Sequence, residues 1–575
     1  MRLQIKETKS SKNFYVIKDY LTKDNKRTTM VVEKLGSESE ILKKCDTLDP
    51  IVWAKKYIDE LNKKEKNIDT IIKKSPFKQL ENNKQTFFNG GYLFLEKIYY
   101  ELGLQNICNK ISDNYSFKYD LNNILSRLIY GRVLSPSSKL ATLDYSNTLL
   151  EKPNFDIQHI YRALEVISKN MDFIQSELYK NSKKVINRNS NLLYYDCTNY
   201  FFEIEQEDEL RKYGKSKENR PTPIVQMGLF LDGNGIPLAF NINPGNTNEQ
   251  ITLKPLEEQI IKDFEYSKFV VCTDAGLSSI ANRKFNNKCN RRFITTQSVK
   301  KLKQHIKDKA IDLTTGWKLP NHKKTYNISN LRTDEDMIKK YKDAVFYKTI
   351  PINENNLEQN LIITYSAKYQ EYQRKIRNNQ IERAKKLIEN NPKKIGKAKS
   401  NDPKRFIKTT QITKDGEVAE NNIHSIDLSL IENEAKYDGI YAVCTNLDDS
   451  VEEIIKINSR RWEIEESFRI MKTEFKSRPV FLSREDRIKA HFTTCFLALM
   501  VYRVLESKMN SEFSAEKIIQ TLRDMNFLEL SKEGFIPSYT RTEITDKIHE
   551  ISGFRTDYEI VTNKQLKKIF KDIKK

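Results

Sequence analysis

The sequence predicts an α/β fold, and three features in the middle of the chain predict this class. Two apolar runs, 191–196 and 268–274, each end in an aspartate and are typical of strands buried on both faces. Between them, the turn Asp-Gly-Asn-Gly at 232–235 separates two further apolar runs, which is a strong signal for a β-hairpin. Residues 247–264 have helical spacing, so strand, hairpin, helix and strand follow one another as in a mixed α/β core.

Residues 1–85 precede this core and are expected to form a small hairpin and a helix. The hairpin is predicted by alternating polar and apolar positions within 1–35, and the helix by the apolar spacing of 50–65.

Residues 86–185 are predicted to form an N-terminal helical domain, because apolar residues recur there at helical intervals. Ser135 followed by Pro136 favours a helix start, since proline fits the first helical position. Short helices at this spacing are compatible with a helix-turn-helix that reads DNA and also with an ordinary helical subdomain.

The α/β core is predicted in two parts, 186–288 and 438–512. Residues 289–437 break its rhythm with polar strands, loops and a long basic helix, so they are expected to form a β-rich or mixed insertion domain. The second part opens with an apolar run at 437–444 and continues as a helix from about 449 to 475. Residues 513–575 are predicted to be a basic helical region.

The composition favours a nucleic-acid partner. The chain has 575 residues, of which 99 are Lys or Arg and 78 are Asp or Glu, giving a net charge of +21. A surplus of this size suggests a polyanion, although Lys enrichment can also follow from AT-rich coding sequence. A membrane is not expected, because the best apolar run, 492–505, is too short to span a bilayer. The N-terminal residues lack the apolar segment of a secretory signal, so we expect a cytoplasmic protein.

Carboxylates are the expected catalytic groups. The seven cysteines include no Cys-x-x-Cys pair and the six histidines include no His-x-x-x-His pair, which disfavours zinc and thiol chemistry. Asp196 and Asp274 each follow a hydrophobic strand, and functional groups gather at the carboxyl ends of such strands. Two carboxylates on adjacent strands can share divalent cations, since oxygen ligands suit Mg²⁺. A single aspartate at a strand end more commonly caps a turn or a helix.

The predicted helix at 449–475 carries a polar stripe. At about 100° per residue, Arg461, Glu465, Lys472 and Asn458 fall within about 60° of one another, whereas Glu466 points away. An adjacent apolar face is formed by Ile457, Ile464, Phe468, Met471 and Phe475. The helix can therefore pack on a sheet while it presents one carboxylate and two cations. A simpler interpretation is a solvent-exposed Arg–Glu pair one turn apart.

These motifs resemble those of a known family. Arg461-x3-Glu465-x6-Lys472 resembles the YREK signature (Tyr-x2-Arg-x3-Glu-x6-Lys) of bacterial insertion-sequence transposases in the IS-four superfamily of DDE transposases. The sequences 195–199 and 272–277 resemble its first-acid and second-acid blocks. The long segment between the second and third acids is similar to the branch numbered sixteen-thirty-four, in which an insertion domain interrupts the core. The signature tyrosine is replaced by Asn458.

The resemblance implies an RNase H-like (retroviral-integrase-like) core in which Asp196, Asp274 and Glu465 are the catalytic metal ligands. They would hold two Mg²⁺ ions, with Mn²⁺ as a substitute, for nicking at the element end followed by strand transfer. The implied partners are double-stranded DNA, as terminal inverted repeats and target, and a second copy of the chain in a homodimer. The implied location is the bacterial cytoplasm, at the nucleoid.

Other residues are predicted to contact DNA. Arg461 and Lys472 would bind terminal phosphates, with Asn458 at the tyrosine position of the signature. Lys215, Lys217 and Arg220 lie in a loop that could approach DNA or be solvated. Trp317, in the insertion, is a candidate for stacking on an extruded base, with a core position as the alternative.

Two rival functions remain open at this stage. A metal-dependent RNase H-like nuclease or resolvase would need the three acids but neither the signature helix nor the long insertion. A non-catalytic DNA-binding protein derived from a transposase would be indicated by a lost acid, and all three acids are present.

Overall fold

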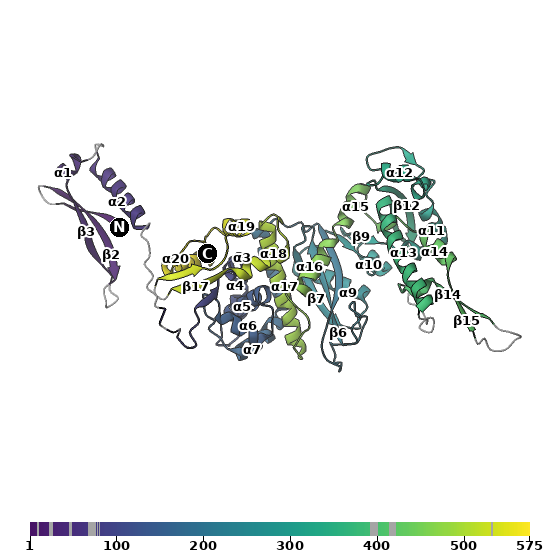
Figure 1. Ribbon diagram of the computed structural model, residues 1–575, viewed down its shortest axis with the longest axis horizontal. Helices are drawn as coiled ribbons and strands as arrows, with labels where there is room; N and C mark the ends of the chain where they lie inside the picture. Colours follow the sequence, from purple (N-terminus) through teal and green to yellow (C-terminus); the bar gives the residue numbers. More distant parts are fainter. Residues whose placement is uncertain are drawn as a thin grey trace. The chain divides into compact units, whose positions relative to one another are not determined.

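Two units make up the chain, Met1–Lys84 and Gln85–Lys575 (Figure 1). The computed structural model describes residues 1–7, 11–21, 27–44, 49–66, 76–77, 79, 81–390, 401–412, 421–530 and 533–575.

The first unit is a three-stranded antiparallel sheet with helices after it. The strands are β1 (Arg2–Glu7), β2 (Lys12–Leu21) and β3 (Arg27–Ser37), followed by α1 (Glu38–Leu42) and α2 (Pro50–Lys66). The hydrophobic core of the unit contains the buried side chains of Phe14, Val16, Leu35, Ile41, Ala54 and Ile58. The predicted helix is present, but the predicted hairpin has a third strand, since 2–7 also alternates apolar and polar positions.

Helices dominate the start of the second unit. They are α3 (Tyr92–Glu101), α4 (Leu104–Ser112), α5 (Leu121–Leu134), α6 (Lys139–Asn147), α7 (Ile157–Lys169) and α8 (Met171–Val185). Ser135 ends α5 as its C-cap, and α6 begins only after Ser138, whose hydroxyl accepts a bond from the Ala141 amide at 3.2 Å. The helix start predicted at Ser135–Pro136 is therefore displaced by three residues.

The C-terminal region pairs with the beginning of this unit. A four-stranded sheet has the order β19-β18-β17-β4. Its strands are β4 (Phe87–Asn89), β17 (Asn526–Leu530), β18 (Gly534–Pro537) and β19 (Val561–Thr562). The associated helices are α18 (Ala515–Asp524), α19 (Glu543–Ser552) and α20 (Asn563–Ile573). The helical region predicted at 513–575 contains these three helices and also three strands, which were not predicted because they carry too few residues to show a clear period.

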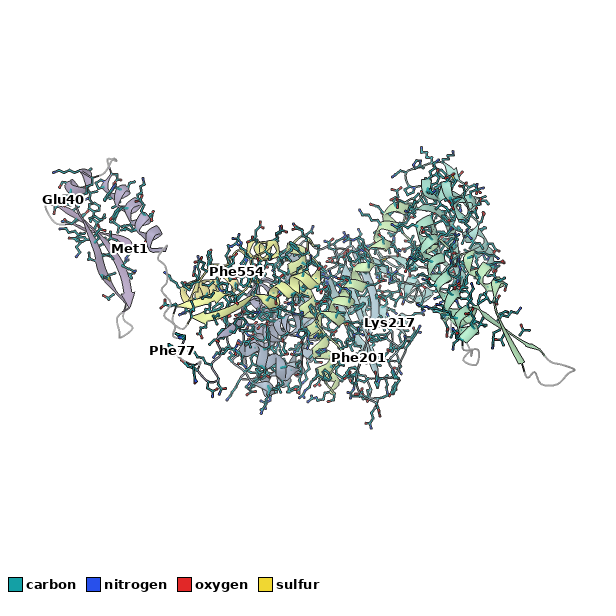
Figure 2. All side chains as sticks on the ribbon, viewed as in Figure 1. Met1, Glu40, Phe77, Phe201, Lys217 and Phe554 are labelled. Carbon is teal, nitrogen blue, oxygen red and sulfur yellow. The ribbon has the colours of Figure 1, made fainter. Side chains whose placement is uncertain are left out.

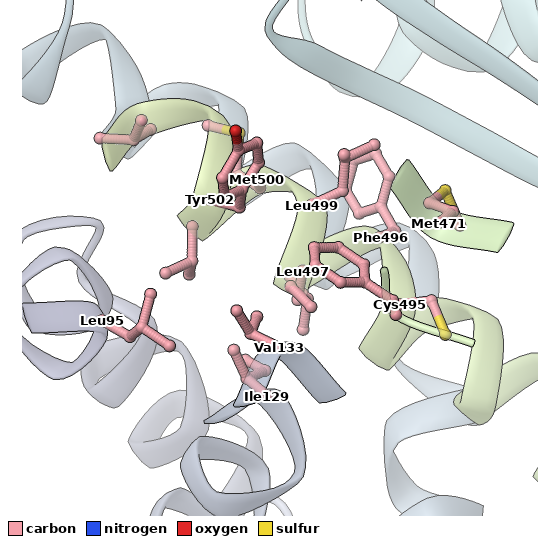
Figure 3. Close-up of a cluster of buried hydrophobic side chains, with 14 of the residues drawn as sticks. Leu95, Ile129, Val133, Met471, Cys495, Phe496, Leu497, Leu499, Met500 and Tyr502 are labelled. Atoms are coloured by element: carbon pink, nitrogen blue, oxygen red, sulfur yellow. The ribbon is translucent and has the colours of Figure 1, made fainter. Parts of the chain in front are cut away.

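Helix α17 (Glu485–Lys508) is the central core helix of the second unit. It contacts α5 and α7 as well as β7 (Pro237–Pro244) (Figure 1). Figure 3 shows its side chains Phe496, Leu497 and Leu499 in one cluster with Val133 of α5. Among the described helices it alone is long and apolar enough to cross a membrane, and 94% of its apolar window is buried inside the protein. This burial confirms the prediction of a core helix.

A ten-stranded sheet forms the α/β core, in the order β11-β10-β12-β13-β16-β9-β8-β5-β6-β7. Its first members in the chain are β5 (Leu192–Phe201), β6 (Ile224–Asp232), β7, β8 (Val270–Thr273) and β9 (Arg292–Thr296). β5, β8 and β9 run parallel to one another, and β6 and β7 form the predicted hairpin beside β5. The fold is therefore mixed α/β, as the sequence predicts.

The segment predicted as an insertion extends this sheet. It adds β10 (Trp317–Lys318), β11 (Thr325–Tyr326), β12 (Phe346–Glu354) and β13 (Leu357–Tyr365), after which β16 (Ile440–Thr445) returns to the centre. Because β13 pairs with β16 and β16 pairs with β9, no break in hydrogen bonding separates the segment from the core.

Additional elements of this segment lie outside the sheet. They are α11 (Gln304–Ile311), α12 (Glu335–Lys340), α13 (Ala367–Asn390), β14 (Ile407–Ile412), β15 (Asn421–Ile426) and α14 (Leu428–Ala435). The basic helix of the sequence is α13; positions 391–400, which follow it, fall outside the described residues.

Helix α9 (Glu249–Asp263) buries a carboxylate that makes stability depend on pH. Glu257 is fully buried and accepts a hydrogen bond from Asn286 Nδ2 at 2.8 Å, and burial raises its pKa to about 8. The folded state holds this proton more tightly than the unfolded state, so stability is lost as pH rises towards 8. Glu257→Gln, which is neutral throughout, should have a higher Tm than the wild type at pH 9, by roughly a few degrees, and no advantage at pH 4. Thermal unfolding at the two pH values tests this, and a pH-independent difference would contradict it.

Candidate active site

Asp196 and Asp274 lie side by side on neighbouring parallel strands. The register pairs Tyr195 of β5 with Thr273 of β8. Asp196 directly follows Tyr195 and Asp274 directly follows Thr273, so the two aspartates are neighbours. β8 ends at Thr273, as the sequence predicts, but β5 runs on to Phe201. Asp196 is therefore inside its strand and not at the end, because β5 continues as the antiparallel partner of β6.

The alternation of β5 sets the face on which Asp196 lies. Tyr194, Asp196, Thr198 and Tyr200 share one face of the strand. Tyr194 Oη donates to the Ile457 carbonyl at 3.0 Å, and Lys472 Nζ donates to Thr198 Oγ1 at 2.6 Å. This face is thus the one covered by α15 (Val451–Ser459) and α16 (Trp462–Thr473), the predicted signature helix.

Burial and charge make Asp196 an unusual carboxyl group. Desolvation raises its pKa to about 6, with a further increase from the negative charge of Asp274. Lys217, Arg461 and the Cys197 amide, which donates to Asp196 Oδ1 at 2.7 Å, act in the opposite direction. A carboxylate held close to a second carboxylate in a partly buried position gains strongly from a bound cation.

Asp274 is held by the turn that follows β8. Its Oδ1 accepts hydrogen bonds from the amides of Gly276 at 2.9 Å and Leu277 at 3.1 Å. A Cβ at Gly276 would lie 3.2 Å from Asp274 Oδ1 and 3.5 Å from Glu249 Oε2. Gly276 therefore lies between the Asp274 carboxylate and that of Glu249, which is at the start of α9.

Lys217 provides the positive charge nearest to these acids. Its Nζ donates to the Cys197 carbonyl and lies 3.6 Å from Glu249 Oε1. Lys217 is labelled in Figure 2, which draws all side chains of the described residues. Although desolvation lowers the pKa of Lys217, the charges of Asp196 and Glu249 raise it more. The ammonium group of Lys217 therefore partly neutralises the carboxylates of Asp196, Asp274 and Glu249.

The aspartate pair suits a divalent cation, although the full predicted set of metal ligands does not converge. Within the described residues, no three His, Cys, Asp or Glu side chains lie close enough to hold one ion. Asp196 and Asp274 are adjacent oxygen donors of the kind Mg²⁺ prefers. Glu465 is exposed and makes no hydrogen bond or ion pair among the described residues.

The signature helix is interrupted. α15 ends at Ser459 and α16 begins at Trp462, and i→i+3 bonds join them, such as Glu463 N to Arg460 O at 3.1 Å. The prediction of one continuous helix was wrong at this point. Each residue of the tighter turn rotates about 120°, which shifts Asn458 relative to Glu465. The apolar face itself is confirmed, since Ile464, Phe468, Met471 and Phe475 are buried and Ile457 is partly buried against the same core.

Arg461 and Asn458 belong to one hydrogen-bonded group. Arg461 Nη1 donates to Thr296 Oγ1 at 3.1 Å, and Asn458 Nδ2 donates to Tyr441 Oη at 3.0 Å. Thr296 and Tyr441 are themselves 2.6 Å apart through their hydroxyl oxygens. The group connects the helix junction to the ends of β9 and β16, which places Arg461 near Asp196.

Lys472 is held over β5. Besides its bond to Thr198, its Nζ lies 3.6 Å from Glu218 Oε1 and 5.5 Å from the centre of the Tyr200 ring. Desolvation, together with the charge of Lys217, lowers the pKa of Lys472 to about 8. An anionic ligand beside Lys472 would raise this pKa again and so favour the charged ammonium form.

Of the remaining residues predicted to contact DNA, the loop residues are exposed and Trp317 is buried. Lys215 and Arg220 are exposed, and the guanidinium of Arg220 lies 4.2 Å from the centre of the Phe201 ring. Trp317 is fully buried in the core of the segment 289–437, with Nε1 donating to the Asp312 carbonyl at 2.8 Å. Base stacking by Trp317 is therefore wrong for this structure, and the core position is the correct alternative.

Several residues of the site were not predicted. They are Glu249, Glu218, Thr198, Thr296 and Tyr441. Only Glu249 carries a sequence signal, as the first residue of a helix capped by Asn248, and that signal is common to many helices.

Comparisons with known proteins identify the family. The family model described as "Transposase DDE domain" matches residues 201–501, more than half of the chain. No curated protein matches the chain. A solved structure described as "Cryo-EM structure of piggyBac transposase synaptic complex with hairpin DNA (SNHP)" is similar with 10% sequence identity and a TM-score of 0.36, covering 82% of this chain and 87% of its own. By the family match, the chain belongs to the transposase DDE domain family and is a transposase.

Proposed function

We propose that this protein is a bacterial insertion-sequence transposase that cuts DNA at the ends of its element and joins the free ends to a target. The IS-four superfamily and its sixteen-thirty-four branch are the proposed placement. The observation that carries the proposal is the in-register aspartate pair under a helix that brings Arg461 and Lys472 to the same sheet face.

The chain's own residues suit phosphodiester chemistry. Asp196 and Asp274 would hold a divalent cation, Mg²⁺ or Mn²⁺, and Glu465, which lies outside that pair in this structure, is the proposed third ligand. Bound ions would activate the attacking oxygen and stabilise the leaving oxygen of the phosphodiester. Arg461 and Lys472 would bind the phosphates that flank the scissile bond, the first through a planar fork and the second as a point charge. The bonds from Arg461 to Thr296 and from Lys472 to Thr198 keep both cations on the side of Asp196.

The missing signature tyrosine has a substitute at the site. Asn458 occupies its place on the helix, and the amide donates to the hydroxyl of Tyr441, which comes from β16. A phenol is thus available beside Arg461 although it comes from a different element. We propose that Tyr441 makes the phosphate contact that the helix lacks.

The proposed partners are the terminal repeats of the element, target DNA and a second copy of the chain. The net charge of +21 supports a polyanionic partner. The proposed place of action is the nucleoid in the bacterial cytoplasm.

Cleavage of a linear DNA that carries the element's own ends, in Mg²⁺, tests the proposal, with Asp274→Ala as the control. Cleavage at the element boundary by the wild type alone would support it. Binding without cleavage in Mg²⁺ or Mn²⁺ would favour a non-catalytic DNA-binding protein. Cleavage irrespective of end sequence would favour a nuclease.

A further inference from the structure

A cavity of about 220 Å³ lies away from the aspartate pair, between the α5–α6 connection and residues 476–482. Its lining is strongly basic. The lining includes Phe481 and His491 together with four Lys or Arg residues: Arg132, Lys139, Lys476 and Arg478. Phe481 is 72% exposed, which is unusual for a side chain of its size.

Lys139 is a buried cation without a partner. Only 6% of the residue is exposed, and its side chain makes no hydrogen bond or ion pair within the described part of the chain. Lysine is almost never buried unless it is paired, because an isolated ammonium loses its hydration. Lys139 lines the cavity, so a ligand there would be its partner.

The groups packed around Lys139 increase the positive potential. Burial and then the charge of Arg132 lower the pKa of Lys139 to about 7. The pKa of His491 is lowered well below its usual value by burial and by the charges of Arg132 and Lys139. No carboxylate of the described residues contributes to either shift. Lys139 and His491 therefore have no carboxylate counter-ion among the described residues.

Arg132 is fixed in its position by main-chain oxygens. Its Nη1 donates to the Phe475 carbonyl at 3.1 Å and its Nη2 to the Ser137 carbonyl at 3.3 Å, while Nε is buried without a partner. The nine-residue helix α6 begins at Lys139, so its N-terminus also faces the cavity. Helix N-termini favour anions through their free amides and dipole.

The cavity is connected to the proposed catalytic face. Arg478, which lines it, forms an ion pair with Glu218, and Glu218 lies 3.6 Å from Lys472 Nζ. The Arg478 guanidinium also lies 5.8 Å from the centre of the Phe201 ring, at the end of β5. Glu218 and Arg478 therefore link Lys472 on the catalytic face to the lining of the cavity.

We propose that this cavity binds a phosphate group of the DNA substrate, with Lys139 as its buried ammonium ligand and exposed Phe481 against the adjoining nucleotide. The inference rests on the proposed function, because DNA is the source of the phosphate. A free nucleotide carries the same phosphate group, and the thermal-shift experiment with dAMP described below distinguishes it from DNA as the ligand.

Lys139→Met is the decisive variant, since methionine has a similar length and no charge. Its affinity for a duplex carrying the element end, measured by fluorescence anisotropy, should fall about tenfold. The slope of log affinity against log salt should lose about one unit, as for one lost phosphate contact. The Tm of the free protein should rise, because an unpaired buried charge is removed. A purely structural lysine would not combine higher stability with weaker binding.

Lys110→Met is the matched control. Lys110 is 58% exposed and pairs with Glu177 at 2.5 Å, so its loss removes the same charge from the surface and should change affinity less than twofold. Lys139→Gln is the second variant and should behave as Lys139→Met does. Equal affinity and salt slope for wild type and both Lys139 variants would overturn the inference.

A thermal-shift measurement with dAMP distinguishes DNA from a free nucleotide as the source of the phosphate. It also distinguishes failure of the proposed function from failure of the cavity proposal. If the wild type binds no duplex, the proposed function fails, and stabilisation by dAMP of the wild type but not of Lys139→Met would keep the cavity as a nucleotide-phosphate site. If the wild type binds duplex and the Lys139 variants bind it equally, only the cavity proposal fails.

Discussion

Asp196→Asn should abolish DNA cleavage and at the same time stabilise the protein in the absence of divalent cations. Loss of a catalytic carboxylate in such sites costs at least ~10³-fold in rate. The stability gain follows from burial next to Asp274, which raises the pKa of Asp196 to about 6. The folded state therefore favours the protonated carboxyl group, and at pH 7.5 the ionised form destabilises it by on the order of 2 kcal/mol.

The pH dependence fixes the sign of this effect. The stability conferred by the raised pKa is complete below the unfolded value near 4 and is lost as pH rises through about 6. Asparagine is neutral throughout, so the Tm advantage of Asp196→Asn in EDTA should be largest at pH 7.5 and should vanish near pH 4. A Tm difference that stays the same across this pH range would show that the folded state does not raise the pKa of Asp196.

Divalent cations provide the second measurement on the same variant. Mg²⁺ should raise the Tm of the wild type, because a ligand that binds only the folded state stabilises it, and should leave the Tm of Asp196→Asn unchanged. Asp343→Asn is the control, since Asp343 is exposed and makes no hydrogen bond or ion pair among the described residues. An equal Mg²⁺ response in wild type and Asp196→Asn would remove Asp196 from the set of metal ligands.

The aspartate pair was predictable from sequence because its signal is local. An apolar run followed by an acid indicates a strand and its end without knowledge of the rest of the chain, and this holds for Asp274 after β8. The length of β5 was not predictable in this way. Residues 197–201 are held in the strand by pairing with β6, whose partner residues lie more than twenty positions away.

Long-range pairing also explains what could not be predicted in the segment 289–437. A change in composition at 289 suggested a separate module, yet hydrogen bonds from β13 to β16 and from β16 to β9 make its strands part of one sheet. Trp317 shows the same limitation, because its burial depends on the segment's own core, in which Tyr365 lies with its ring centre 6.2 Å from that of Trp317. Sequence spacing carries no information about such contacts.

The helix junction illustrates a different limit. Regular helical spacing correctly predicted that Ile464, Phe468 and Met471 of α16 are buried, since they lie within one continuous helix. It did not predict the burial of Glu463, Ser467 and Ile470. It could not predict the tight turn at Arg460 and Arg461, where the first turn of α16 meets Thr296 and Glu463 pairs with Arg460 at 2.7 Å. The orientation of Glu465 relative to Arg461 is the part of the site least determined by the sequence.

Glu465→Gln should reduce cleavage at least ~10³-fold with little change in stability, whereas Glu466→Gln should retain activity. The two glutamates are neighbours in sequence, and the substitutions are nearly isosteric. Glu465 is exposed and has no partner among the described residues, so its amide should not alter the Tm. Glu466 accepts hydrogen bonds from Arg469 Nε at 2.7 Å and Nη2 at 2.6 Å, so its carboxylate is already paired.

The comparison separates catalysis from folding because the expected effects run in opposite directions. Loss of the Glu466–Arg469 pair, which is partly exposed, should lower stability by about 0.5 kcal/mol and leave the cleavage rate within a few-fold of the wild type. Single-turnover cleavage at saturating DNA and thermal unfolding measure the two effects independently. If Glu465→Gln cleaves like the wild type while Glu466→Gln does not, the tight turn at Arg461 has rotated the helix so that Glu466 is the third acid. If both variants cleave normally, the carboxylate that completes the aspartate pair comes from another element, and Glu249 beside Lys217 is then the residue to replace.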